Sequence, residues 1–236
     1  MGSQYAYNAV FVIGNSHEVE MKGAEKEHYN SVLVFESGKN VHPPEPGMYS
    51  KIKLVPFTES FPWKHTFSSL YVKLLNGSPH MWEKGEEYTV FNYRGLKFST
   101  PICFEDTFST VCRQMVLNGS RCFINLSNDS WSKSIPCQRQ HLSMAVFRSV
   151  ENGVPSVRST ASGVTCIISP NGKIERAAPE FCEAFVIGEV PVIDDDVQTL
   201  FTRYGDIAGI AQVVLSCFIL IIQTFVVIIK SIKNHR

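Results

Sequence analysis

The feature that most constrains this chain is an uncharged, apolar run near its C-terminus. Residues Ile207–Ile229 read IAGIAQVVLSCFILIIQTFVVII, 23 residues without an acidic or basic side chain. At a helical rise of about 1.5 Å per residue, the run is long enough for the ~30 Å hydrocarbon core of a bilayer. A helix buried in a soluble core is the alternative, but such helices seldom run this far without a polar face. We therefore predict one transmembrane helix over residues 206–230.

Basic residues follow the predicted span, namely Lys230, Lys233 and Arg236. Positive charge beside a span favours the cytoplasmic side of a membrane. We expect residues 231–236 to form a basic cytoplasmic tail and residues 1–205 to lie outside the cytoplasm. The predicted location is the cell (inner) membrane.

The composition of the chain indicates a folded domain ahead of the span. Apolar residues make up 44% and charged residues 19% of 236 residues, which is typical of a chain that buries a core. The formal net charge is zero, so nucleic acid is not an expected partner. The seven cysteines are irregularly spaced and form no C-x-x-C pair, so we predict neither a zinc ribbon nor a disulfide framework. No metal or other cofactor is expected.

Hydrophobic patterning divides residues 1–205 into short strands and two helices. Two segments, residues 15–28 and the proline-rich residues 40–65, are expected to be loops. Arg94-Gly95 and Pro170-Asn171-Gly172 are expected to be hairpin turns. The alternation predicts an α/β layered domain with mixed sheets. The predicted strands cover residues 8–14, 29–35, 88–93, 95–103, 121–126, 154–158, 163–169 and 185–190, and the predicted helices cover residues 105–118 and 136–152.

One cysteine lies at a predicted junction between a strand and a helix. Cys103 stands in STPICFED, after a predicted strand and just before a predicted helix. Such an elbow points a side chain out of the sheet edge, where the helix dipole favours a thiolate and free N–H groups can hold an oxyanion. A buried structural cysteine, with Glu105 and Asp106 as first-turn acids, is the alternative that the local pattern leaves open.

Three further polar spots are candidates, each with an ordinary structural alternative. Lys51 stands in a proline-bounded loop, where a solvated surface charge is the common reading. Asn128 and Trp131 follow a predicted strand at the kind of sheet edge where ligands bind, but they also fit a turn. His141 lies on the second predicted helix and fits a hydrogen-bonded structural residue as well as a base.

Taken together, several motifs resemble the nitrilase (carbon–nitrogen hydrolase) superfamily, and most closely its membrane branch, the apolipoprotein N-acyltransferases. LVPF-x-E just after the lysine, together with the C-terminal helix, is similar to that branch rather than to soluble amidases. The stretches that carry the resemblance are YNSVLVF at 29–35, YSKIKLVPFTE at 49–59, ICFED at 102–106, INLSNDSW at 124–131 and QHLSMAVFRSVENGVPSVRSTASGVTCIISPNGKI at 140–174.

The resemblance implies an α-β-β-α nitrilase-like sandwich, incomplete at its N-terminal end, and a Glu–Lys–Cys triad. Cys103 matches the nucleophile and Lys51 the lysine, whose charge would stabilise the thiolate and the oxyanion. Glu59 and Glu105 match supporting acids that would orient or neutralise Lys51. Asn128, Trp131 and His141 are candidates for a substrate lid.

The chain also departs from the family pattern. The family's general-base Glu belongs to a strand-end motif upstream of the lysine, and none of six glutamates before Lys51 stands in that context. A general base is therefore not found in this chain, and we expect it in a missing N-terminal membrane half. Phe104 replaces the common Tyr, and Ser132-Lys133 replaces Phe-Gly. The six glutamates are Glu18, Glu20, Glu25, Glu27, Glu36 and Glu45.

The resemblance implies an acyltransferase that takes an acyl chain from a phospholipid donor. The expected acceptor is the N-terminal diacylglyceryl-cysteine of an apolipoprotein, and the expected intermediate is a Cys103 thioester. Two alternatives stay open. One is an extracytoplasmic amide hydrolase of the wider superfamily, and the other is an inactive fragment or split half that lacks the general base.

Overall fold

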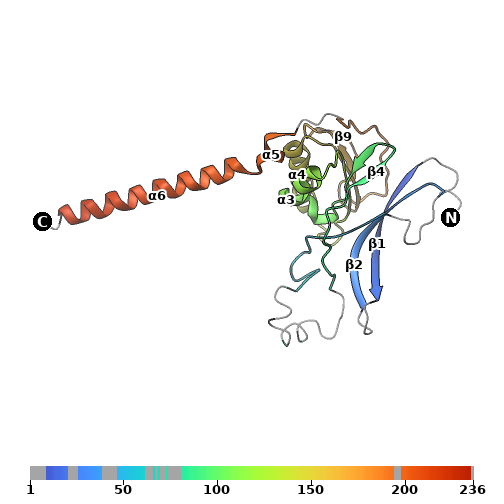
Figure 1. Ribbon diagram of the computed structural model, residues 1–236, viewed down its shortest axis with the longest axis horizontal. Helices are drawn as coiled ribbons and strands as arrows, with labels where there is room; N and C mark the ends of the chain where they lie inside the picture. Colours follow the sequence, from blue (N-terminus) through green and yellow to red (C-terminus); the bar gives the residue numbers. More distant parts are fainter. Residues whose placement is uncertain are drawn as a thin grey trace. The chain divides into compact units, whose positions relative to one another are not determined.

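The computed structural model describes residues 9–20, 26–38, 47–61, 66, 69, 73, 81–193 and 198–234. The chain divides into two units, residues 1–197 and 198–236. The first unit holds the sheets and the candidate site. The second holds two helices (Figure 1).

Three antiparallel strands form the first sheet, in the order β1-β2-β3. They are β1 (Val10–Glu20), β2 (Lys26–Glu36) and β3 (Gly47–Ser50). The strands predicted at residues 8–14 and 29–35 are present, but the loop predicted at residues 15–28 is wrong. β1 and β2 stay paired as far as Glu20 and Lys26, because polar cross-strand contacts such as that of Lys26 with Glu18 suit a solvent-exposed ribbon.

A short hairpin, β4 (Phe91–Tyr93) with β5 (Leu96–Phe98), follows the prediction around Arg94 and Gly95. Both turn residues have positive φ, 51° and 89°, as a two-residue hairpin turn of this hand requires. Asn92 supports the turn by accepting a 3.0 Å hydrogen bond from the Gly95 N–H. The hairpin delivers the chain to the extended residues 99–102.

Four strands form the second sheet, in the order β6-β7-β8-β9, with β6 and β7 parallel and the other pairs antiparallel. Ser99 and Ile102 pair in parallel with β6, so the segment before Cys103 runs along this sheet. The strands are β6 (Phe123–Asn128), β7 (Ser156–Ala161), β8 (Cys166–Ile168) and β9 (Ile174–Ala177).

The strand predicted over residues 185–190 is wrong. That segment runs without a ladder partner, and it leaves the side chains of Phe185 and Ile187 exposed at 82% and 76%. Its apolar alternation is real, but only Val190 of this stretch packs against the main core. The predicted turn at residues 170–172 is confirmed, since it joins β8 to β9.

Helices α3 (Ser109–Leu117) and α4 (Ile135–Asn152) lie together beside the second sheet (Figure 1). Pro136 in the first turn of α4 and the left-handed Gly153 after its end fit the predicted helix. Apolar side chains of α3, including Val111 and Met115, share one core with Tyr49 of β3 and Phe123 of β6. The α/β layered class with mixed sheets that the sequence predicts is confirmed by this arrangement.

The second unit contains α5 (Leu200–Tyr204) and α6 (Ile207–Asn234). The Asp206 carboxylate accepts a 2.9 Å hydrogen bond from the Gly209 N–H and so caps the start of α6. Ile207–Ile232, 26 residues of α6, is long and apolar enough to cross a membrane. The predicted helix is confirmed as a candidate span by length and composition.

Candidate active site

Cys103 is the first residue of η1 (Cys103–Thr107), a single 3₁₀ turn, and its backbone has φ of 49°. A left-handed conformation costs a residue with a side chain about 1–2 kcal/mol, so its surroundings must hold it. Buried Asn125 of β6 does so, because its amide donates to the Pro101 and Cys103 carbonyls at 2.9 and 3.0 Å. The strained turn points to a functional position.

The helix predicted over residues 105–118 is divided in two, with η1 and α3 separated at Phe108, where ψ is 106°. Side chains donate hydrogen bonds to backbone carbonyl groups that would otherwise accept from the next turn of a continuous helix. The Thr107 hydroxyl donates to the Phe104 carbonyl at 2.8 Å, and Arg148 of α4 donates to the Thr107 carbonyl at 3.0 Å. The elbow at Cys103 is therefore tighter than the sequence predicts.

Glu105 is fully buried and joins the two segments that carry Cys103 and Lys51. Its carboxylate accepts hydrogen bonds from the backbone N–H groups of Ile102, Ile52 and Lys53, at 2.8 to 2.9 Å. The Glu105 carboxylate contacts the backbone beside Lys51 and not the Lys51 ammonium group. Glu105 therefore clamps the backbone, whereas the sequence led us to expect that it neutralises Lys51. The clamp fixes the spacing of the two loops.

Tyr49 completes the Glu105 clamp from β3. Its hydroxyl lies 2.9 and 3.0 Å from the two carboxylate oxygens of Glu105. Burial raises the pKa of Glu105 above its usual value, while the donors around it act in the opposite direction. Burial and the neighbouring Glu105 together raise the pKa of Tyr49, so this hydroxyl keeps its proton and stays a donor.

Lys51 follows β3 directly, and its side chain is wholly buried. Its ammonium group donates to both carboxylate oxygens of Glu59 at 2.7 Å. Glu59 also accepts from the Val55 N–H at 2.8 Å, which closes a compact loop over residues 55–59. A buried lysine needs such a partner, and the pair fixes the cation in place.

Gly85 supports the backbone at Lys51. The Gly85 N–H donates to the Lys51 carbonyl at 2.8 Å. A Cβ added at position 85 would lie 2.1 Å from the Ser50 carbonyl oxygen, which is far inside contact distance. The close approach therefore requires glycine.

A cavity of about 1080 Å³ opens between the two sheets of the first unit. Cys103, Glu59 and Trp82 line it together with apolar residues of β1 and β2 such as Val12 and Val32. Cys103 lies 52 positions after Lys51 and 44 after Glu59 in the sequence, yet Cys103 and Glu59 line the same cavity. A thiol, a fixed cation and a largely apolar cavity suit covalent transfer of an apolar group.

The three lid candidates differ in position. Asn128 and Trp131 line the cavity and are exposed, Trp131 at 69%. His141 also borders the cavity, but its ring is buried and contacts a carboxylate oxygen through each nitrogen. These contacts fit the structural alternative for His141, and its assignment to a lid stays a prediction.

The remaining described cysteines help to single out Cys103. Burial raises the pKa of the thiols of Cys112, Cys122 and Cys166. The pKa reaches about 12 for Cys122 and about 11 for Cys166. These three stay protonated and unreactive at neutral pH. Cys103 is partly exposed and is the cysteine that lines the large cavity.

Both carboxylates on the described cavity wall already have partners. Glu59 is bonded to Lys51, and Asp129 accepts from Ser127 at 2.7 Å and contacts His141. Of the six upstream glutamates, Glu18 and Glu27 are engaged on the β1–β2 ribbon by Lys26 and Tyr29. Neither lines the cavity. The side chains of Glu20, Glu25 and Glu45 lie outside the described residues.

Several buried residues at the site are not among the candidates named from the sequence motifs. Tyr49, Asn125 and Arg158 are all buried and bonded to segments at the cavity. Tyr49 and Asn125 stand inside the quoted motifs, two positions before Lys51 and at the start of NLSND. Polar side chains within predicted buried strands are the signal that points to Asn125 and Arg158, whereas Tyr49 lies in the segment predicted as a loop.

Comparisons with known proteins identify the family of this chain. The family model described as carbon–nitrogen hydrolase matches residues 5–194. The chain is 43% identical over 220 residues to apolipoprotein N-acyltransferase 1 of Treponema pallidum (strain Nichols), covering 92% of this chain and 40% of the relative. It is 43% identical over 209 residues to the protein of the same name from Treponema denticola, covering 88% and 38%. The chain thus spans about two fifths of these relatives.

Solved structures support the fold. A carbon–nitrogen hydrolase from Helicobacter pylori G27 aligns with a TM-score of 0.55 at 16% identity. The alignment covers 75% of this chain and 60% of that one. At this identity the likeness bears on the fold alone.

Proposed function

Because this chain belongs to the carbon–nitrogen hydrolase family, we propose that it takes part in N-acylation of apolipoproteins, with Cys103 as the acyl-carrying nucleophile. The observation that carries the proposal is the joining of a strained Cys103 turn to the buried Lys51–Glu59 pair through the Glu105 clamp. The names of the relatives supply the reaction class. The donor is a phospholipid and the acceptor is the amino group of an N-terminal diacylglyceryl-cysteine.

The proposed reaction has two transfers. In the first, the Cys103 thiolate attacks an ester carbonyl of the phospholipid, a C–S bond forms, the ester C–O bond breaks, and a lysophospholipid leaves with a proton. In the second, the acceptor amine attacks the thioester, a C–N bond forms, the C–S bond breaks to return the thiolate, and the proton lost by the amine passes to the general base. Lys51 stabilises the negative charge at each stage through its fixed ammonium group.

We propose that the general base comes from a further segment or chain. On the described wall, Lys51 holds both oxygens of Glu59, and Asp129 is buried with Ser127 and His141 at Oδ1 and Arg158 facing Oδ2, so each carboxylate already serves a charge network. The role fits the strand-end Glu that the sequence analysis expects in an N-terminal membrane half.

The apolar helix α6 supplies the location in this proposal. Both proposed substrates reside in a bilayer, and a predominantly apolar span of 26 residues keeps the site at its surface. The proposed site lies in the cell (inner) membrane with the first unit outside the cytoplasm and the C-terminus inside, as the basic residues after the span favour.

The test is transfer of a labelled acyl chain from phospholipid vesicles to a synthetic peptide that bears an N-terminal diacylglyceryl-cysteine. The chain is expressed together with the coding sequence immediately upstream, so that the proposed base is supplied. We expect amide-linked label on the peptide and none with Cys103→Ala. Ammonia release from soluble amides, unaffected by removal of residues 207–236, would instead support an amide hydrolase.

A further inference from the structure

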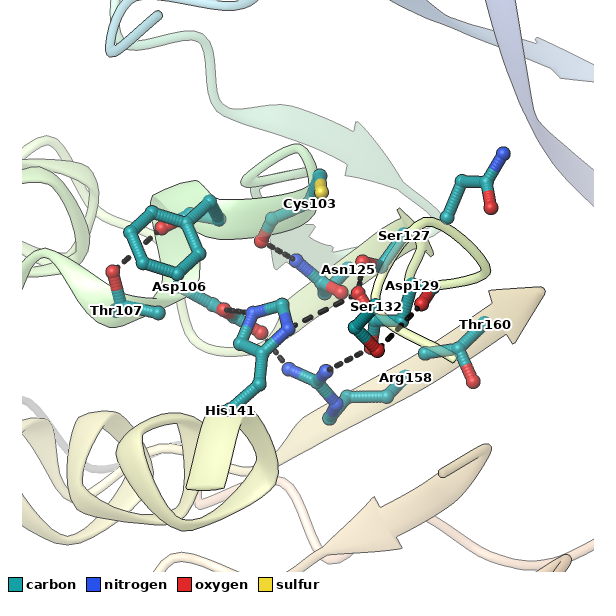
Figure 2. Close-up of polar contacts among 12 residues, drawn as sticks. Cys103, Asp106, Thr107, Asn125, Ser127, Asp129, Ser132, His141, Arg158 and Thr160 are labelled. Atoms are coloured by element: carbon teal, nitrogen blue, oxygen red, sulfur yellow. Dashed lines mark hydrogen bonds and ion pairs between the residues drawn. The ribbon is translucent and has the colours of Figure 1, made fainter. Parts of the chain in front are cut away.

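Four charged or ionisable side chains from four different parts of the fold meet beside the Cys103 turn (Figure 2). Asp106 belongs to η1, Asp129 follows β6, His141 lies on α4 and Arg158 on β7. Their side chains are between 1% and 7% exposed. The mechanism above uses none of the four.

The contacts are specific. His141 Nε2 lies 2.8 Å from Asp106 Oδ1, and His141 Nδ1 lies 3.1 Å from Asp129 Oδ1. Arg158 Nη1 donates to the other oxygen of Asp106, and Nη2 lies 3.9 Å from the other oxygen of Asp129. Gly163 packs so closely that an added Cβ would lie 2.4 Å from Asp129 Oδ2. The histidine therefore bridges two aspartates that the arginine also faces.

Hydrogen-bond chemistry constrains the charge of this histidine. A neutral imidazole has one donor and one acceptor nitrogen, whereas an ionised carboxylate only accepts. Two nitrogens that both face carboxylate oxygens are satisfied together only when both carry protons. The same state balances the charge, because two aspartates against Arg158 alone would bury one unpaired negative charge.

Arg158 contributes a full positive charge to this balance. Burial lowers the pKa of its guanidinium to about 10, with Cys166 and Cys103 acting in the opposite direction, so it is charged at neutral pH.

We propose that His141 is held as an imidazolium and is a positioning residue for Cys103. Asp106 stands three residues after Cys103 in the same short turn, while Asp129 opens the loop that carries Trp131 at the cavity. The imidazolium fastens these two segments together. Without it, the two carboxylates face each other unbridged and the turn at Cys103 loosens. The inference rests on the proposed role of Cys103, but its tests use neither lipid substrate.

The first test reads the charge of His141 directly. The full chain, labelled with ¹⁵N-histidine in detergent micelles, is examined by NMR at pH 7, and the His141 signals are assigned by their loss in His141→Gln. We expect both ring nitrogens to be protonated. In Asp129→Asn an amide N–H can donate to Nδ1, so the ring should become neutral with its proton on Nε2. A neutral ring in the wild type, or an unchanged ring in Asp129→Asn, would overturn the proposal.

The second test reads positioning through the rate at which iodoacetamide alkylates Cys103, followed by peptide mass spectrometry. His141→Gln should slow the reaction about 10-fold, because small displacements of a reacting group cost rate steeply. His17→Gln, on β1 and away from the network, is the matched control and should react like the wild type.

A double variant separates the charge bridge from simple packing. In the double variant His141→Gln with Asp129→Asn, the side-chain amides at positions 141 and 129 can form a hydrogen bond with each other. Asp106 can still accept a hydrogen bond from the amide at position 141, and it still contacts Arg158. Most of the alkylation rate should return. A wild-type rate in His141→Gln alone, or no recovery in the double variant, contradicts the positioning role. If His141→Gln does not fold, the His141 signals are assigned by elimination from single Gln variants of the other six histidines, and the NMR comparison of wild type with Asp129→Asn then decides the charge state.

Discussion

At the scale of single residues, the candidate site depends on buried polar groups that each hold backbone or another charge. Asn125 ties down the carbonyls around Cys103, and Glu105 joins that turn to the segment after Lys51. Family motifs in the sequence select Cys103, Lys51, Glu59 and Glu105. They do not reveal that Glu105 binds backbone N–H groups, because such a role depends on two segments about 50 positions apart.

Cys103 and Lys51 should respond differently to truncation. Cys103→Ala removes a partly exposed thiol, so the free energy of unfolding should change by less than about 1 kcal/mol. Lys51→Ala leaves Glu59 without its partner and should cost about 1–3 kcal/mol. Urea unfolding measures both, and adding Glu59→Gln to Lys51→Ala should recover part of the loss. Equal stability of the two single variants would contradict a buried Lys51–Glu59 pair.

Glu105→Gln should lower the free energy of unfolding by about 1–3 kcal/mol, because an amide cannot accept from all the donors around this position. Exposed Glu183→Gln is the matched control. Burial raises the pKa of the Glu105 carboxyl group in the folded protein. The contribution of Glu105 to the free energy of unfolding is therefore complete at pH values below its pKa in the unfolded chain. That contribution is lost as the pH rises through its pKa in the folded protein. Urea unfolding across pH should show this slope in the wild type and not in Glu105→Gln. The same slope in both would contradict the assignment.

At the scale of elements, patterning predicts the strands that bury one face, the long helix α4 and both hairpin turns. It fails where long-range partners decide. The ribbon end of β1 reads as a loop because its side chains are polar, and residues 185–190 read as a strand although no neighbour pairs with them. The break at Phe108 arises from Arg148, a partner 40 positions later.

Gly85 offers a test of how an element positions the site. Gly85→Ala places a Cβ against the Ser50 carbonyl, which cannot move without disturbing β3 and Lys51. We expect a loss of about 1–3 kcal/mol in the free energy of unfolding, as for other overpacked sites. Gly14→Ala, where an added Cβ meets only the Leu126 side chain at 3.9 Å, is the control for replacing glycine without a close contact. Wild-type stability of Gly85→Ala would show that the close contact is absent.

At the scale of the whole molecule, the sequence predicts an α/β unit followed by one apolar helix, and both are present. We predict that the full chain stays with membranes after alkaline carbonate extraction, because a predominantly apolar helix of 26 residues buries most of its side chains in hydrocarbon. Release of the chain into the supernatant would contradict the proposed span.

The most direct measurement of the central claim is the trapping of an acyl group on Cys103. The chain, expressed with the coding sequence immediately upstream, is mixed with labelled phospholipid vesicles without acceptor and digested for mass spectrometry. We predict one acyl group on the peptide that contains Cys103, removed by neutral hydroxylamine as a thioester should be, and no label on Cys103→Ala. An unlabelled Cys103, or a label that persists in Cys103→Ala, would contradict the account.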